Sequence, residues 1–152
     1  MKSIPTKILV FFCHNLQLFK NGSRNDFARS WTGLKFVALP CSGKVEAHHL
    51  LKALAGGVQG VLVLACAESA CQFLEGSMRS RRRLQYARTW LEELGIEPAR
   101  LEFRHISPMD LDALETILRE FNGRLQVFGK LSTSSAPHAP NVSGKPTMEE
   151  ER

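Results

Sequence analysis

The sequence lacks any long hydrophobic stretch. Its N-terminal apolar run, Ile8 to Cys13, is too short for the core of a signal peptide, and no small-residue cleavage site follows it. A membrane-spanning helix needs roughly 20 apolar residues, and no segment approaches that length. We therefore expect a cytoplasmic protein without direct membrane insertion.

Nucleotide-binding and nucleic-acid-binding motifs are also missing. No Gly-x-Gly-x-x-Gly follows a predicted strand and no Walker pattern occurs, so a nucleotide or flavin bound by this chain alone is not expected. The net charge of +5 is modest, and no nucleic-acid-binding motif accompanies it, so nucleic acid is not an expected partner. Much of that charge comes from one cluster, which predicts either a solvated helix face or a docking face for an acidic partner: Arg79, Arg81, Arg82, Arg83 and Arg88.

Cysteine is scarce. The chain has only four, at positions 13, 41, 66 and 71, and the Cys-x-x-Cys spacing typical of thiol oxidoreductases is absent. In a reducing compartment an even number of cysteines favours metal or redox chemistry over disulfides. Free cysteines are also common as small buried hydrophobic residues, so their positions must decide between these interpretations.

The chain nevertheless has enough apolar residues for one globular core. Of its 152 residues 43% are apolar and 23% charged, as in an ordinary single domain. Continuous apolar runs predict four buried strands, and they lie at 7–12, 34–39, 60–65 and 101–106.

Helical patterns alternate with these strands. We expect helices near 44–55, with Glu46 in the first turn, and over 76–94, which Gly95 would end. A last helix is expected to start at Ser107 with Pro108 in its first turn. The segment 14–33 predicts a loop with a short helix, and Leu125–Phe128 predicts a final edge strand.

This alternation predicts a single α/β domain over residues 1–131, with a mostly parallel sheet and flanking helices, in the manner of Rossmann and flavodoxin folds. Residues 132–152 are rich in Ser, Thr and Pro and predict a flexible or partner-bound tail. In open parallel sheets, sites form beyond the carboxyl ends of the strands.

The cysteines follow the predicted strands. Cys13 follows the first strand, Cys41 the second and Cys66 the third, and Cys71 comes five residues after Cys66. Neighbouring strands are about 4.8 Å apart, so loops leaving them can bring the sulfurs to one point. We therefore predict that these four cysteines bind one metal centre.

Two kinds of centre accept four thiolates. Iron–sulfur clusters with two or four irons do so, and so does structural zinc. Zinc sites usually have two tight Cys-x₂₋₄-Cys pairs, whereas only Cys66 and Cys71 form such a pair here, so an iron–sulfur cluster is favoured. His14 could replace a thiol as in Rieske centres, but we expect it either to lie beside the ligands without binding the metal or to be exposed. His48 and His49 are expected on a helix surface.

Residues 34–117 resemble the methyl-viologen-reducing hydrogenase delta subunit family, also called the hydrogenase iron–sulfur subunit. The resembling segments are Cys41-Ser42-Gly43-Lys44-Val45, Gly60 to Cys66 with Cys71, Glu75-Gly76, Arg81-Arg82-Arg83 and Leu91 to Pro98.

The resemblance implies an electron-transfer subunit with one [2Fe–2S] cluster on Cys13, Cys41, Cys66 and Cys71. It also implies partners: a heterodisulfide-reductase-A-like flavin and iron–sulfur subunit, and a second redox enzyme of hydrogenase, formate dehydrogenase or aromatic-ring reductase type. Such complexes of anaerobic metabolism can perform electron bifurcation. No stand-alone catalysis is expected. The alternative is a non-redox or zinc-binding structural subunit that bridges the same components.

The chain departs from the family pattern at two places. The family often has Cys-Asn-Trp-Cys where this chain has Cys13-His14-Asn15-Leu16, so four of the usual five cysteines remain. Between Cys66 and Cys71 the family typically has His-Pro-Gly-Asp, and this chain has Ala67-Glu68-Ser69-Ala70. The immediate surroundings of a cluster would therefore differ, which bears on its reduction potential.

Overall fold

A computed structural model describes residues 2–19, 31–67 and 75–131 of the chain. Cys71, the middle of the predicted 14–33 loop and the predicted tail at 132–152 lie outside these ranges. Within them, no helix combines the length and apolar character needed to cross a bilayer.

The core of the fold is a four-stranded, fully parallel sheet in the order β2-β1-β3-β4. Its strands are β1 (Lys2–Cys13), β2 (Trp31–Leu39), β3 (Gly60–Ala65) and β4 (Leu101–His105). All six residues of β3 are buried, because helices cover both faces of the sheet at this strand. The predicted α/β fold with a parallel sheet is confirmed.

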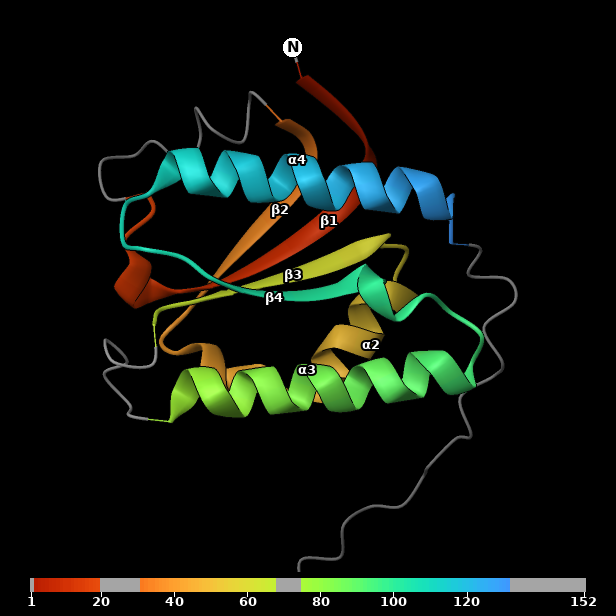
Figure 1. Cartoon of the computed structure of the whole chain (residues 1–152), viewed down its shortest axis with the longest axis horizontal. Helices are drawn as coiled ribbons and strands as arrows, with labels where there is room; N and C mark the ends of the chain where they lie inside the picture. The colour runs from red at the N-terminus through yellow and green to blue at the C-terminus, as the bar shows by residue number, and fades with distance from the viewer. Residues whose placement is uncertain (1, 20–30, 68–74, 132–152) are drawn as a thin grey trace, which may run out of the picture.

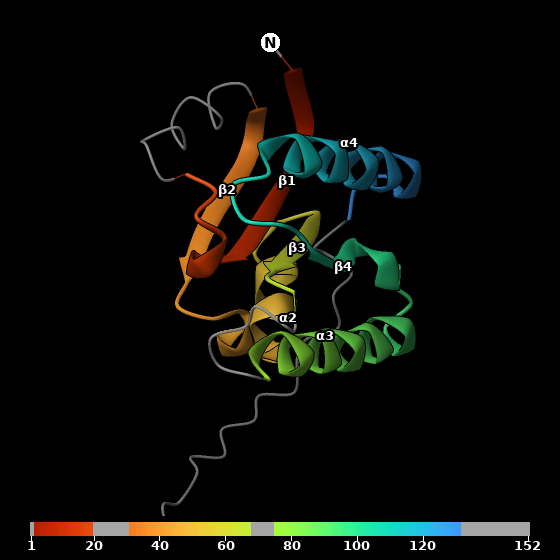
Figure 2. The same cartoon turned by 60° about the vertical axis from the view of Figure 1, so that its left-hand side comes forward.

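Helices form a layer on each side of the sheet (Figure 1). Helix α4 (Leu111–Phe128) lies on one face, and α2 (Ala47–Ala55) and α3 (Gly76–Glu93) lie together on the other. Each layer encloses its own apolar cluster: Ile8, Leu62 and Leu118 belong to the α4 side, and Val61, Leu84 and Leu101 to the α2–α3 side. Figure 2 shows β2 at one edge of the sheet and β4 at the other.

Most predicted boundaries are close to the observed ones. The segment after Cys13 begins with a short 3₁₀ helix, η1 (His14–Leu16). The predicted helix at 44–55 is divided into η2 (Ser42–Lys44) and α2, because Glu46, the N-cap of α2, has an extended backbone. Gly95 has a φ of 73° and ends the last turn of α3, as predicted.

Two predictions around α4 are wrong. The helix begins at Leu111 rather than near Pro108, because the carboxylate of Asp110 accepts a hydrogen bond of 3.0 Å from the Ala113 amide and is the N-cap. Leu125–Phe128 forms the end of α4 rather than an edge strand. Leu125 follows Phe121 by one turn, and both pack beside Gly60, so helical spacing buries them on the sheet.

A buried arginine forms hydrogen bonds to three segments at the amino-terminal edge of the sheet. Arg100, in η4 (Pro98–Arg100), is 1% exposed and bonds the Glu97 carboxylate at 2.7 Å. It also donates to the carbonyls of Gln59 at 3.0 Å and Gly129 at 2.8 Å. Three segments that are far apart in sequence therefore share one guanidinium.

The turn after β2 packs directly on the start of α3. A Cβ atom on Gly43 would lie 3.0 Å from the Gly76 Cα atom and 3.2 Å from the Gly76 oxygen. Arg83 of α3 holds the same turn by donating to the carbonyls of Gly43 and Val45. A side chain at position 43 would therefore push these two backbones apart.

The first prediction concerns Arg100. We expect Arg100→Ala to lower the free energy of unfolding by about 3 kcal/mol, because it empties a buried position and leaves two carbonyls and the Glu97 carboxylate without their shared donor. Urea denaturation measures this. The matched control is Arg119→Ala, which breaks an exposed pair with Glu115 and should cost less than about 0.5 kcal/mol. Equal losses in the two variants would contradict the central role of Arg100.

The same variant has a pH signature. The hydrogen bond from Arg100 lowers the pKa of Glu97, outweighing the opposite effect of burial. Because the folded pKa is depressed, the stabilisation from this pair is present above the ordinary value near 4.5 and lost as pH falls through the lowered value. The stability difference between wild type and Arg100→Ala should therefore shrink on acidification.

The second prediction concerns Gly43. We expect Gly43→Ala to destabilise the fold by about 1–3 kcal/mol, because the new methyl group meets backbone atoms that cannot rotate away. The control is Gly123→Ala, at an exposed position inside α4 with no described atom near the added Cβ. That substitution should stabilise by up to about 1 kcal/mol. Thermal unfolding of both variants checks the opposite signs.

Candidate functional site

The carboxyl ends of the three neighbouring strands β2, β1 and β3 lie at one edge of the sheet. In the hydrogen-bonded register, Cys13 of β1 is paired with Leu39, the last residue of β2, and Phe12 is paired with Leu64 of β3. Cys41 comes two residues after Leu39, and Cys66 directly follows β3. Figure 1 shows the chain leaving these strands on the same side of the molecule. The predicted placement of the three cysteines is therefore observed.

All three cysteines are buried. Cys13, Cys41 and Cys66 are 3%, 5% and 1% exposed, and all are present as thiols. They belong to one apolar cluster, the one that α4 covers. Because all three side chains are buried, water has little access to their sulfur atoms.

The backbone around Cys41 is held by short-range contacts. Its sulfur accepts a hydrogen bond of 3.4 Å from the Gly43 amide, at the start of η2. Arg83 and the start of α3 hold the other side of this turn, as described above. Gly76, the first residue of α3, lies five residues after Cys71 in the sequence and packs on Gly43, two residues after Cys41.

His105 supports Cys66 from the next strand. Its Nδ1 atom lies 3.0 Å from the carbonyl oxygen of Cys66, at the end of β4. The amide of Ile106 donates to Ala65 at 3.1 Å and extends the same ladder by one bond. Sequence reasoning missed His105, although a polar residue at the end of the fourth predicted strand was a usable signal.

The arginine cluster is divided between two roles. Arg83 donates to the turn after β2, and Arg88 donates to the carbonyl of Leu101 at 2.8 and 2.6 Å. Burial lowers the pKa of Arg88, with Glu102 opposing that effect. Arg79 pairs with Glu75 on the surface. Arg83 and Arg88 therefore stabilise the fold by binding backbone carbonyls, and only part of the cluster forms an exposed basic face.

The predicted ligand set can be compared with the described residues. Three of the four cysteines lie at the same sheet edge, and Cys71 lies outside the described ranges. Within those ranges, no group of three His, Cys, Asp or Glu side chains is arranged to hold a metal ion. The three described thiols have the chemistry of metal ligands and share one sheet edge, but they do not form a preassembled metal site, so they would have to converge to bind one.

The histidines considered from sequence lie at the surface. His14 follows Cys13 and is exposed. His48 pairs with the Glu46 carboxylate at 3.2 Å, and Nδ1 of His49 accepts a hydrogen bond from the Glu46 amide. His48 and His49 therefore belong to the capping of α2, as expected for residues on a helix surface.

Comparison with known proteins gives matches over most of the chain. Residues 8–129 match the family described as methyl-viologen-reducing hydrogenase, delta subunit. One relative is the iron–sulfur subunit of an F420-non-reducing hydrogenase from Methanopyrus kandleri, 35% identical over 101 residues that cover 66% of this chain and 76% of the relative. The corresponding iron–sulfur subunit from Archaeoglobus profundus is 34% identical over 96 residues, covering 63% and 70%.

A different kind of relative contains the same region in a longer chain. It is the A component of the ferredoxin/F420H2-dependent CoB-CoM heterodisulfide reductase from Methanosarcina acetivorans, 28% identical over 102 residues. The match covers 67% of this chain but 13% of that relative. The family match itself spans β1 from Ile8 onward and every later strand and helix through the end of α4. This chain belongs to the methyl-viologen-reducing hydrogenase delta subunit family.

Proposed function

We propose that this protein is an electron-transfer subunit that holds one [2Fe–2S] cluster on Cys13, Cys41, Cys66 and Cys71. The observation that carries this proposal is the burial of three thiols at the carboxyl ends of three adjacent parallel strands. Four cysteine thiolates are the usual ligand set of such a cluster, and relatives in the family are named iron–sulfur subunits.

The surroundings of the thiols suit this role. A bound cluster carries one electron at a time, and its potential depends on burial and on hydrogen bonds near the sulfurs. The chain supplies an apolar cluster around three cysteines, an amide at the Cys41 sulfur and the His105 contact that holds the end of β3. These residues would fix the thiols and exclude water from them.

The partners follow from the names of the relatives. Iron–sulfur subunits of hydrogenases lie in the family, so a hydrogenase-type enzyme is the proposed second redox component. In the heterodisulfide reductase relatives, the similar region is part of the A component itself. This supports a heterodisulfide-reductase-A-like flavin and iron–sulfur subunit in the position next to this chain. Formate dehydrogenase and aromatic-ring reductase types remain proposed alternatives to the hydrogenase, and electron bifurcation would be a property of the whole complex.

The competing function is a structural subunit that binds zinc or no metal. A zinc site would use the same thiols and would give no visible absorption, because Zn²⁺ has a filled d shell. The chain has one tight pair, Cys66 and Cys71, rather than the two that zinc sites usually have, and this favours the iron–sulfur proposal.

The third prediction tests the ligand set. Anaerobically purified protein should be brown and contain about two iron and two acid-labile sulfide ions per chain, with zinc near zero. Each of the single variants Cys41→Ser, Cys66→Ser and Cys71→Ser should lose most of the visible absorption and iron, because a hydroxyl is a poor ligand for iron in such a cluster. Absorption, iron and sulfide are measured on freshly purified protein.

Ser42→Ala is the matched control. Ser42 is adjacent to Cys41 and 1% exposed, and its hydroxyl has no hydrogen-bond partner among the described residues. Its removal should leave colour, iron and stability nearly unchanged. Full colour in Cys41→Ser would refute the ligand assignment, and a colourless wild-type protein with one zinc per chain would establish the structural alternative.

A further inference from the structure

The described helices α2 and α3 cover only part of the sheet face on which they pack. Helix α2 packs on β3 and α3 packs on β4, so Val61 and Leu101 on this face are fully buried. Strand β2 lies at the sheet edge beyond α2 (Figure 2). The apolar side chains that β1 and β2 place on this face are only half-buried, and they are Leu9, Phe11, Val37 and Leu39.

These side chains share one face because of the strand register. Phe11 is paired with Val37, and Leu9 is paired with Lys35. Paired residues of adjacent strands project to the same side of a sheet. Leu9, Phe11 and Leu39 pack at the margin of the α2–α3 cluster, which identifies this side as the α2 side.

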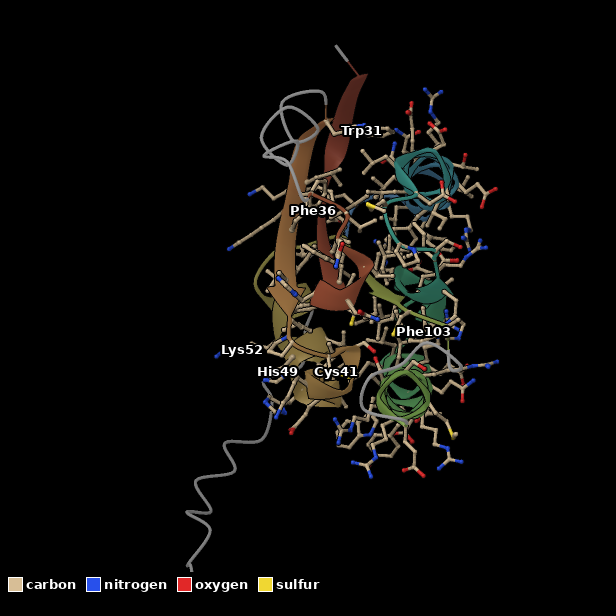
Figure 3. The ribbon with its side chains drawn as sticks, turned by 90° about the vertical axis from the view of Figure 1, so that its left-hand side faces the viewer. Trp31, Phe36, Cys41, His49, Lys52 and Phe103 are labelled. Carbon is tan, nitrogen blue, oxygen red and sulfur yellow. The ribbon has the colours of Figure 1, made fainter. Side chains whose placement is uncertain are left out.

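Beside α2 this face forms a groove of about 350 Å³, which we call the β2 groove. Phe11, Leu39, Val45 and Ala53 supply its apolar surface, and Lys44, His49 and Lys52 supply its polar rim. Figure 3 shows His49 and Lys52 on the α2 side, with Lys52 projecting outward. Lys35 is exposed on the same face of β2.

The rim carries charge of one sign. No carboxylate is among the described residues that line the β2 groove, whereas Lys44 and Lys52 are. The neighbouring hollow over α2 and α3 is mixed in charge, because both Glu46 and Arg83 line it, and the exposed rings of Tyr86 and Trp90 line it as well. The positive rim of the β2 groove therefore favours a partner with acidic side chains.

The part of this face over β1 and β2, which the described helices leave half-exposed, is about as wide as one helix. An α-helix with side chains is about 10 Å across, and two strands at about 4.8 Å spacing span a similar distance. We propose that the β2 groove and the adjoining face of β2 bind an amphipathic helix of a partner subunit, with its apolar stripe on Phe11, Val37 and Leu39 and its carboxylates on Lys35, Lys44 and Lys52.

Other occupants fit less well. The chain's own tail contains Glu149, Glu150 and Glu151, but Pro140 and Pro146 interrupt the segment before them and no apolar stripe accompanies these carboxylates. A second copy would bring another chain of net charge +5 against a lysine rim. An acidic helix satisfies both the apolar surface and the rim.

The β2 groove reaches the sheet edge that carries the candidate thiols, while the thiols themselves belong to the apolar cluster on the α4 side. Leu39 in the groove is the register partner of Cys13, and Lys44 follows Cys41 by three residues. A helix bound there belongs to a subunit held beside the sheet edge that carries the cysteines. The role of this partner in donating or accepting electrons rests on the proposed function, whereas its binding does not.

The first experiment maps contacts in the assembled complex. The tagged full-length chain is purified from its native host with its bound subunits and treated with a zero-length carbodiimide, which joins an amine to a carboxylate in contact. Lys35, Lys44 and Lys52 should be linked to Asp or Glu residues of one partner subunit at spacings of three or four. Lys130, exposed beyond the far end of α4, should show no such links.

The second experiment reverses charge. Lys44→Glu with Lys52→Glu should weaken retention of that partner at least tenfold and reduce its sensitivity to salt. The control is Arg81→Glu with Lys130→Glu, which changes the net charge equally at exposed positions outside the groove and should retain the partner. Colour and iron per chain should be the same in both variants, which separates a failure of docking from a failure of the cluster.

Three results would overturn the proposal. Links from the groove lysines to Glu149–Glu151 of the same chain would assign the tail as occupant, and links between two copies would assign a dimer. Loss of the partner in Arg82→Glu with Trp90→Ala, but not in the lysine variant, would place the interface on the α2–α3 face.

Discussion

The hydrogen-bonded register of β1 with both of its neighbours is the constraint on which the site depends. Because β1 pairs in parallel with β2 and with β3, the carboxyl ends of all three strands are level at one edge. The same ladder that satisfies the buried backbone therefore determines where Cys13, Cys41 and Cys66 lie. A shift of one residue in either pairing would turn the alternating side chains to the other face and displace one thiol from the edge.

The sheet and the placement of the cysteines could be predicted because both follow from strong local signals. Continuous apolar runs mark buried parallel strands, and β3 was predicted with its observed bounds. A residue that directly follows such a run must lie at the carboxyl edge, which gave the positions of Cys13 and Cys66. The position of Cys71 stays a prediction, supported by the Gly43–Gly76 contact downstream of it.

What the sequence did not predict depends on contacts between distant segments. Pro108 was a reasonable helix start, but the competing cap at Asp110 has the better geometry for the Ala113 amide. Leu125 could belong to a short strand or to a longer helix, and only its packing beside Gly60 decides between them. His105 and Arg83 act on backbone carbonyls 39 and 40 residues away, so no local pattern identifies either role.

The position of the missing fifth cysteine is occupied by a core residue, Leu16. Leu16 stands where the family pattern has its second cysteine of the first pair, and it is 0% exposed in η1. Its side chain belongs to the apolar cluster that α4 covers, and its carbonyl accepts a hydrogen bond of 2.8 Å from the Met109 amide before α4. The position contributes to the core instead of offering a thiol. A four-ligand cluster in this chain would therefore have no spare ligand, and each of its four cysteines would be required.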